Sequence, residues 1–291
     1  MKFVLLIILF CVGTVSAVPA EVDDRVEYTT SLNSIASIVM NWYGSLITTN
    51  ENVSFAATEK KWDLYRSYYP HNMTQIHITE TDLTKVEGSD NYQFSVDSLV
   101  SYKNTTGEHS QLISETFIFQ LLPFAQPIIK SISINKVEQK EVVHTIKFNR
   151  AHYKAREFAY AWIAYLDGVE MMQATIYADQ WLDKASYSVK IGGDVIQGSV
   201  ATTLAKRKQY LAKGGHLLRS LDIKKIAGKS NTFILDLIVE WKGINQTGKP
   251  VLAKIHQEIE YKIQDNNAWH VISIKEQHLL PDIAPWAGLL C

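Results

Sequence analysis

The sequence predicts an α+β protein made of two tandem units, each a curved antiparallel sheet packed on helices. Two observations carry this prediction: helical and strand patterns follow one another in the same order twice, and matched blocks of sequence recur in that order. The length of 291 residues is sufficient for two domains of ordinary size. We expect the first unit at 30–141 and the second at 150–279, with an apolar tail at 280–291.

Each unit begins with an amphipathic helix. Apolar side chains recur at steps of three and four over 35–46 in the first unit and over 155–166 in the second. Trp42 and Trp162 occupy matching places in the two patterns. The two helices are therefore expected to play the same role in their units.

A second helix is expected in each unit, at 54–61 and at 199–206, where the two sequences align. The second unit carries an insert between its first two helices. The insert is typical of a short helix at Met171–Trp181, a strand at Lys184–Ile191 and a turn at Gly192–Asp194. The first unit lacks this piece and is predicted to be a trimmed copy.

Each unit ends in a meander of long strands. Ser95–Tyr102 aligns with Ile234–Trp241, and both strands run into an Asn-x-Thr-Gly turn, at Asn104–Gly107 and at Asn245–Gly248. Alternation predicts that one face of each strand is buried. In the second unit the apolar row consists of Phe233, Leu235, Leu237, Val239 and Trp241, and the opposite row contains Ile234, Asp236, Ile238 and Glu240.

The charge balance argues against a polyanionic partner. Lys and Arg together number 29 and Asp and Glu number 30, so no long-range field attracts nucleic acid or an anionic membrane. The 46% hydrophobic and 20% charged content is typical of globular proteins. We expect no nucleic-acid partner.

The N-terminus has the pattern of a signal peptide at 1–17, with Lys2, an apolar stretch and small residues up to Ala17. We therefore expect a secreted or periplasmic protein that is cleaved near Ala17 and has no transmembrane segment. Cleavage would remove Cys11 and leave only Cys291, so no intramolecular disulfide is expected. Cys291 is then a terminal thiol or an intermolecular bridge. Asn-x-Ser/Thr sites at Asn52, Asn72, Asn104 and Asn245 would carry glycans in a eukaryotic secretory route.

The element order, the long strands and the aromatic first helix Tyr160-Ala-Trp-Ile-Ala-Tyr-Leu-Asp167 give the chain a family resemblance. It resembles the nuclear transport factor 2-like superfamily of cone folds, which includes ketosteroid isomerase, scytalone dehydratase and polyketide-cyclase-like proteins. The second unit matches the whole element order, and the first matches all but the region between its first two helices. The resemblance implies an apolar pocket between helices and sheet. It also implies pairing through the outer faces of the sheets, which would make the tandem units an internal pseudo-dimer.

No standard catalytic motif accompanies this pattern. The sequence has no Gly-x-Ser-x-Gly elbow, no Gly-x-x-x-x-Gly-Lys-Ser/Thr loop, no His-Glu-x-x-His and no Cys-x-x-Cys. Its nine histidines lack ligand spacing. We expect neither a metal nor another cofactor.

Enzymes of the resembled superfamily use general acid–base chemistry inside the pocket. The resemblance implies Asp236, His216 and Tyr165 as candidate catalytic residues of the second unit. A carboxylate or histidine would move a proton next to a carbonyl, and a tyrosine would stabilise the oxyanion. Further candidates to line the pocket are Trp162, Asp167, Trp181 and Tyr187.

Each candidate has a structural alternative. Trp162 fits core packing, and Tyr165 fits a buried ring with its hydroxyl bonded to the backbone. His216 fits a cap of the preceding helix. Asp236, which recurs as Asp97 in the first unit, fits a contact between the units or a solvent-facing position.

Three functions remain open from the sequence. The first, which we expect, is a non-catalytic protein that binds a small apolar ligand in its second unit. The second is an enzyme of the isomerase or dehydratase type, and the third is a structural or protein-interaction module. The tail at 280–291 either folds back over a hydrophobic edge or docks a partner.

Overall fold

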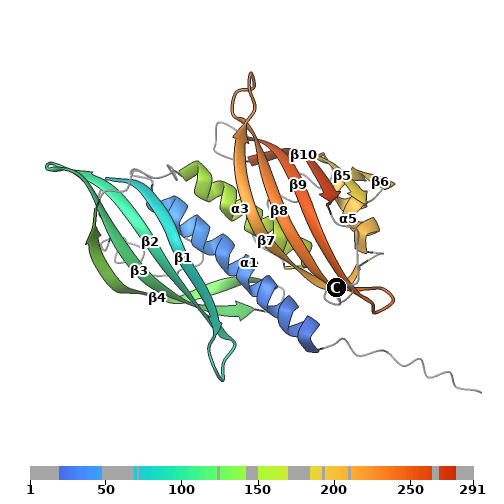
Figure 1. Cartoon of the computed structure of the whole chain (residues 1–291), viewed down its shortest axis with the longest axis horizontal. Helices are drawn as coiled ribbons and strands as arrows, with labels where there is room; N and C mark the ends of the chain where they lie inside the picture. The colour runs from blue at the N-terminus through green and yellow to red at the C-terminus, as the bar shows by residue number, and fades with distance from the viewer. Residues whose placement is uncertain are drawn as a thin grey trace, which may run out of the picture.

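The computed structural model describes residues 20–47, 69–70, 72–122, 125–141, 150–169, 184–191, 194–208, 211–263 and 269–279. These residues form two β-sheets and three helices, and the predicted α+β class is confirmed (Figure 1). The first half contains α1 (Ala20–Leu46), β1 (Met73–Lys85), β2 (Asn91–Asn104), β3 (Gly107–Leu122) and β4 (Ala125–Lys140). The second half contains α3 (Arg150–Leu166), β5 (Ser186–Ile191), β6 (Asp194–Ser199), α5 (Val200–Lys208), β7 (Leu211–Lys225), β8 (Thr232–Asn245), β9 (Pro250–Ile263) and β10 (Trp269–His278).

The two sheets differ in size and in strand direction. The first has four antiparallel strands in the order β1-β2-β3-β4. The second has six strands in the order β6-β5-β10-β9-β8-β7, and β10 pairs with β5 in parallel. The prediction of a wholly antiparallel sheet is therefore wrong at this pair. No hairpin joins β5 to β10, so no turn dictates opposite directions for them.

The predicted alternation along the meander is confirmed in the second sheet. Leu235, Leu237 and Val239 of β8 are fully buried, as are Ile255 and Ile259 of the neighbouring β9. Their row packs against α3 in one hydrophobic core, to which the helix contributes Ala155, Phe158, Ala159, Trp162 and Ile163. The opposite row of β8 is only half-buried.

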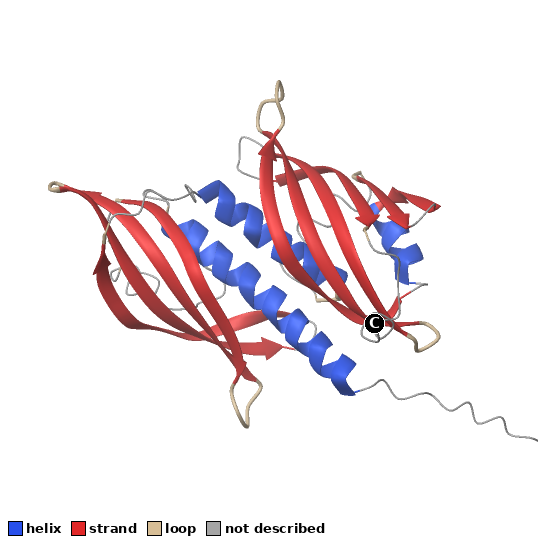
Figure 2. Cartoon of the chain, in the orientation of Figure 1, coloured by secondary structure: helices blue, strands red, loops and turns tan. Residues whose placement is uncertain are grey.

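Helices α1 and α3 form a layer between the two sheets (Figure 2). One face of α3 packs on the second sheet, and its other face supplies Tyr153, Ala161 and Ala164 to the core of the first half. Helix α1 contacts both α3 and β7. The expected pairing through the outer faces of the sheets is thus not the contact found, because the two halves meet through their helices.

Helix α1 is longer than its apolar pattern predicted. It begins at Ala20, whereas the pattern starts at 35. The added turns are polar in sequence yet bury Thr29, Asn33 and Ser34 against the rest of the molecule. No helix in the described ranges is both long enough and apolar enough to span a bilayer.

The β2–β3 and β8–β9 turns are built alike. Asn104 Oδ1 accepts hydrogen bonds from the backbone N–H and the hydroxyl of Thr106, at 2.8 and 2.7 Å. Asn245 Oδ1 accepts the same two bonds from Thr247, at 3.0 and 2.8 Å. Both Asn-x-Thr sequences therefore close a hairpin turn, which explains why Asn and Thr occur together there.

Several sequence predictions fall outside the described residues. These are the signal peptide at 1–17, the helices at 54–61 and Met171–Trp181, the tail at 280–291 with Cys291, and the side chain of Trp181. The expected helix at 199–206 is present as α5.

Candidate functional site

Asp167 and His216 meet where α3 ends. The Asp167 carboxylate accepts a hydrogen bond from the backbone N–H of His216 at 2.9 Å, and its other oxygen is bonded to the ring Nδ1. The side chains of His216 and Asp167 are 3% and 1% exposed. They form a buried pair that joins two elements 49 residues apart in the chain.

The end of α3 places the carboxylate. Gly168 has a φ of 89°, which favours glycine, and its N–H bonds to the carbonyl of Tyr165 at 3.0 Å. The N–H of Val169 returns to the carbonyl of Ala164 at 3.0 Å. This left-handed helix end fixes the direction of Asp167, the residue directly before it.

Two glycines in β7 make room for the histidine's neighbours. A Cβ at Gly214 would lie 2.1 Å from the Trp241 ring, and one at Gly215 would lie 1.9 Å from Thr29 Oγ1. Trp241 is paired with His216 across β7 and β8, with 6.4 Å between ring centroids. The two glycines therefore let an aromatic ring and α1 approach the strand.

The pairing sets the chemistry of the imidazole. An ionised carboxylate can only accept hydrogen bonds, so Nδ1 of His216 carries the proton that it donates to Asp167. In that tautomer Nε2 carries the lone pair and is the ring nitrogen able to accept a proton. A buried carboxylate that orients a histidine is the arrangement expected of a general base.

A second polar group lies among apolar side chains of the same half. The buried carboxylate of Glu276 accepts bonds from Tyr187 OH at 2.5 Å and from Gln257 Nε2 at 2.6 Å. His278 Nε2 lies 3.1 Å from its other oxygen. Trp162 Nε1 donates to Gln257 Oε1 at 3.1 Å, so helix, strand and carboxylate form one hydrogen-bonded network.

The structure brings together three of the predicted aromatic residues. Trp162 contacts Tyr187 edge-on at 6.1 Å between centroids and stacks with Tyr165 at 6.0 Å. Tyr165 lies on the turn of α3 that precedes Asp167. Trp162 and Tyr187 are almost fully buried, and Tyr165 is partly buried.

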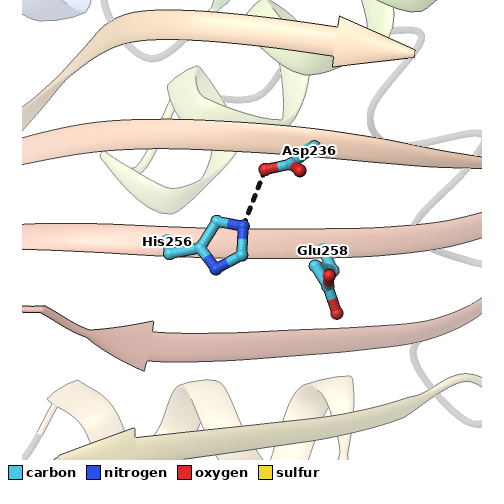
Figure 3. A group of neighbouring side chains, drawn as sticks. All are labelled: Asp236, His256 and Glu258. Atoms are coloured by element: carbon cyan, nitrogen blue, oxygen red, sulfur yellow. Dashed lines mark hydrogen bonds and ion pairs between the residues drawn. The ribbon is translucent and has the colours of Figure 1, made fainter. Parts of the chain in front are cut away.

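Asp236 does not lie on the side of the sheet where His216 and Tyr165 were expected to meet it. It lies on the face of β8 opposite the buried row, where its carboxylate bonds to His256 Nε2 at 2.6 Å (Figure 3). The same carboxylate pairs with Lys224. The prediction that Asp236 is an acid of the same site is wrong, because successive residues of a strand point to opposite faces.

The surroundings of Asp236 are those of an ion pair. The hydrogen bond from Lys224 lowers the pKa of Asp236, and the bond from His256 acts in the same direction. Ligand-type atoms of Asp236, His256 and Glu258 lie within 4.8 Å of one another, so these three residues could hold a divalent cation (Figure 3). Lys224 already neutralises one of the carboxylates.

The first half has a buried acid of its own. Glu115 of β3 is 1% exposed and accepts a bond from Tyr43 OH at 2.5 Å. Burial raises the pKa of Glu115 to about 7, although the hydrogen bond from Tyr43 and the neighbouring Tyr69 hydroxyl act against the shift.

Sequence reasoning missed Gln257, Glu276 and Glu115. The alternation of inward and outward residues along a strand could have revealed Gln257, because it interrupts the inward row between Ile255 and Ile259. A polar residue at an inward position of a buried row must find an internal partner. A break of this kind in an apolar row therefore marks a polar group of the core.

No family model matches the sequence, and no curated protein matches it. Solved structures give partial similarities. A hexachlorocyclohexane dehydrochlorinase from Novosphingobium barchaimii is 13% identical over 42% of this chain and 82% of its own, with a TM-score of 0.34. A nuclear transport factor 2-like superfamily protein from Salmonella enterica serovar Typhimurium is 9% identical over 44% and 91%, with a TM-score of 0.33.

A protein of cystatin-like fold from Caulobacter vibrioides is 15% identical over 45% of this chain and 92% of its own, with a TM-score of 0.32. Each of these three matches spans less than half of this chain. Similarities of this size assign the chain neither a family nor an activity. Its function has to be argued from its own residues.

Proposed function

We propose that the second half catalyses proton transfer at carbon in a small organic molecule, with His216 as the general base. The observation that carries the proposal is the Asp167 carboxylate, which bonds both the backbone N–H and the ring Nδ1 of His216 in a buried setting. This arrangement supports a basic Nε2 held in one orientation.

The reaction is of the isomerase or dehydratase type. Nε2 of His216 takes a proton from the carbon next to a carbonyl. The C–H electron pair becomes the C=C bond of an enolate, and the carbonyl π pair moves onto the oxygen. In a β,γ-unsaturated ketone the imidazolium then returns the proton to the γ-carbon, so that the double bond moves into conjugation and the carbonyl re-forms. In a β-hydroxy ketone it gives the proton to the β-hydroxyl, which leaves as water as the carbonyl re-forms and the α,β double bond is made. Tyr165 is the proposed hydrogen-bond donor to the enolate oxygen. The rings of Trp162 and Tyr187 favour a largely apolar substrate.

Deuterium incorporation tests this proposal without a known substrate. The purified protein is incubated in D₂O with a panel of aliphatic and aromatic ketones and β-hydroxy ketones, and loss of the α-proton signal is followed by ¹H NMR. We expect His216→Gln and Asp167→Asn to slow the exchange of an active compound at least about a hundredfold.

Asp236→Asn is the matched control, because this carboxylate lies on the other face of β8 and its loss should leave the exchange rate unchanged. Circular dichroism of each variant separates lost chemistry from lost folding. Equal exchange rates for the wild type and His216→Gln across the whole panel would contradict the proposal.

A second candidate is non-catalytic binding of a small apolar ligand, favoured by the contacts of Trp162 with Tyr165 and Tyr187. A carrier needs the aromatic residues but not the base. Native mass spectrometry distinguishes the two functions: for a carrier, a co-purifying molecule is retained by His216→Gln and lost from Trp162→Ala.

The proposal places this site in the complete one of two tandem cone-like copies, with the first copy trimmed. Similar Asn-x-Thr turns and buried first-helix tryptophans, Trp42 and Trp162, support two copies of one unit. The signal-like pattern at 1–17 supports a secreted or periplasmic location. Mass measurement of the mature protein should find a chain that begins just after Ala17.

A further inference from the structure

Helix α1 of the first half presents a polar row to the second half. The row consists of every fourth residue, which places its members on one side of the helix. Its members are Arg25, Thr29, Asn33, Ser37 and Asn41. Each of them contacts a residue of the second half.

The two ends of the row are tied by charged groups. Arg25 forms an ion pair with Glu240 of β8 at 2.8 Å. At the other end, Lys154 Nζ of α3 donates to Asn41 Oδ1 at 2.7 Å. Between them, Thr29 lies against the backbone of Gly215, next to His216. The row therefore holds α1 in a fixed register on β7 and α3.

The centre of the row reaches the candidate base. Asn33 is fully buried, and its Nδ2 donates to the backbone carbonyl of His216 at 2.7 Å. Asn33 Oδ1 is buried and has no hydrogen-bond partner among the described residues. The bond to His216 is therefore the hydrogen bond that anchors the amide.

The backbone of His216 is thus held from both sides. Its N–H donates to Asp167 of the second half, and its carbonyl accepts a hydrogen bond from Asn33 of the first half. A buried backbone group that loses its hydrogen-bond partner destabilises the fold, so the strand would shift to recover a partner. A shift of this backbone moves the ring that it carries.

We propose that Asn33 is a positioning residue for His216, so that the first half completes the site of the second. The inference rests on the proposed role of His216 as a base. It gives the first half a direct part in the function, beyond packing. Asn33 acts through the His216 backbone and touches no reacting atom.

Asn33→Leu tests the inference, because leucine has a similar branched shape and a higher helix propensity than asparagine but has no donor. Asn33→Ser is a second variant, with a side chain too short to bridge the gap. In the full-length protein, we expect both variants to raise the amide exchange rate of His216 at least tenfold. We also expect both to shift its ring nitrogen resonances in long-range ¹H–¹⁵N spectra.

Asn41→Ala is the matched control from the same row, and it should leave the His216 signals unchanged while removing the Lys154 contact. Unchanged ring signals and unchanged exchange in the Asn33 variants would overturn the inference. This readout needs no substrate. Failure of the acid–base proposal is seen separately, in the deuterium exchange of His216→Gln.

Discussion

Glu115 lies in the core of the first half beside two phenols. Its side chain has almost no contact with solvent, and Tyr43 donates to one of its oxygens. Desolvation disfavours the charged form, which is why the pKa of Glu115 is raised to about 7. The folded protein therefore keeps a proton that the unfolded chain releases from about pH 4.5 upwards.

This difference makes stability depend on pH. Below about pH 4.5 Glu115 is protonated in both states, and its full contribution to stability is present. As pH rises towards 7 the unfolded state binds fewer protons, so the free energy of unfolding falls by about 3 kcal/mol in total. We expect Glu115→Gln to remove this fall in urea unfolding curves measured between pH 4.5 and 8.

The exposed Glu80 provides the control, since Glu80→Gln should retain the wild-type pH dependence. If the wild type and Glu115→Gln lost stability equally over this range, another group would be responsible.

Single residues were only partly predictable from the sequence. His216 and Asp167 were each identified as candidates, but their pairing was not, because no local pattern joins residues 49 positions apart. The outward position of Asp236 followed from alternation along β8, whereas its recurrence as Asp97 was compatible with a pocket acid, a contact between the units or a solvent-facing position. The alternation along the strand predicted the position of Asp236 better than its recurrence did.

At the scale of elements, strands and turns were predicted well. The Asn-x-Thr-Gly turns fall where expected, and the apolar rows of β8 and β9 are buried. The N-terminal part of α1 was missed, because its buried side chains include Thr29 and Asn33, and a polar sequence gives no apolar stripe. Its partner is the other half of the chain, which local periodicity does not reveal.

The matched turns make a prediction for both hairpins. Asn104→Ala and Asn245→Ala each remove two bonds to a threonine, and each should lower the free energy of unfolding by about 1 kcal/mol. Chemical denaturation measures the loss. Thr105→Ala, a change in the same exposed turn, is the control and should stay within about 0.5 kcal/mol of wild type.

Over the whole molecule, the sequence indicated two halves but not how they meet. The family resemblance implied contact through sheets, whereas α1 packs on α3 and β7. The close approach of α1 at Gly215 is the sharpest test of this arrangement. A Cβ there would lie 1.9 Å from Thr29 Oγ1.

Gly215→Ala should therefore destabilise the protein by about 1–3 kcal/mol through overpacking. Thr29→Ala removes the clashing oxygen, so the double variant should recover much of that loss. The coupling energy from the four proteins in thermal unfolding measures the contact. Strictly additive losses would mean that α1 does not pack on β7 in this way.

The burial of α3 on both of its faces has an evolutionary consequence. A gene fragment that encoded the second half alone would produce a protein in which the α3 face that packs on the first half is uncovered, and such a protein is prone to aggregate. Recombination that exchanged one half for a foreign domain would meet the same penalty. The two halves are therefore expected to be inherited together, with substitutions on α1 compensated by substitutions on α3 and β7.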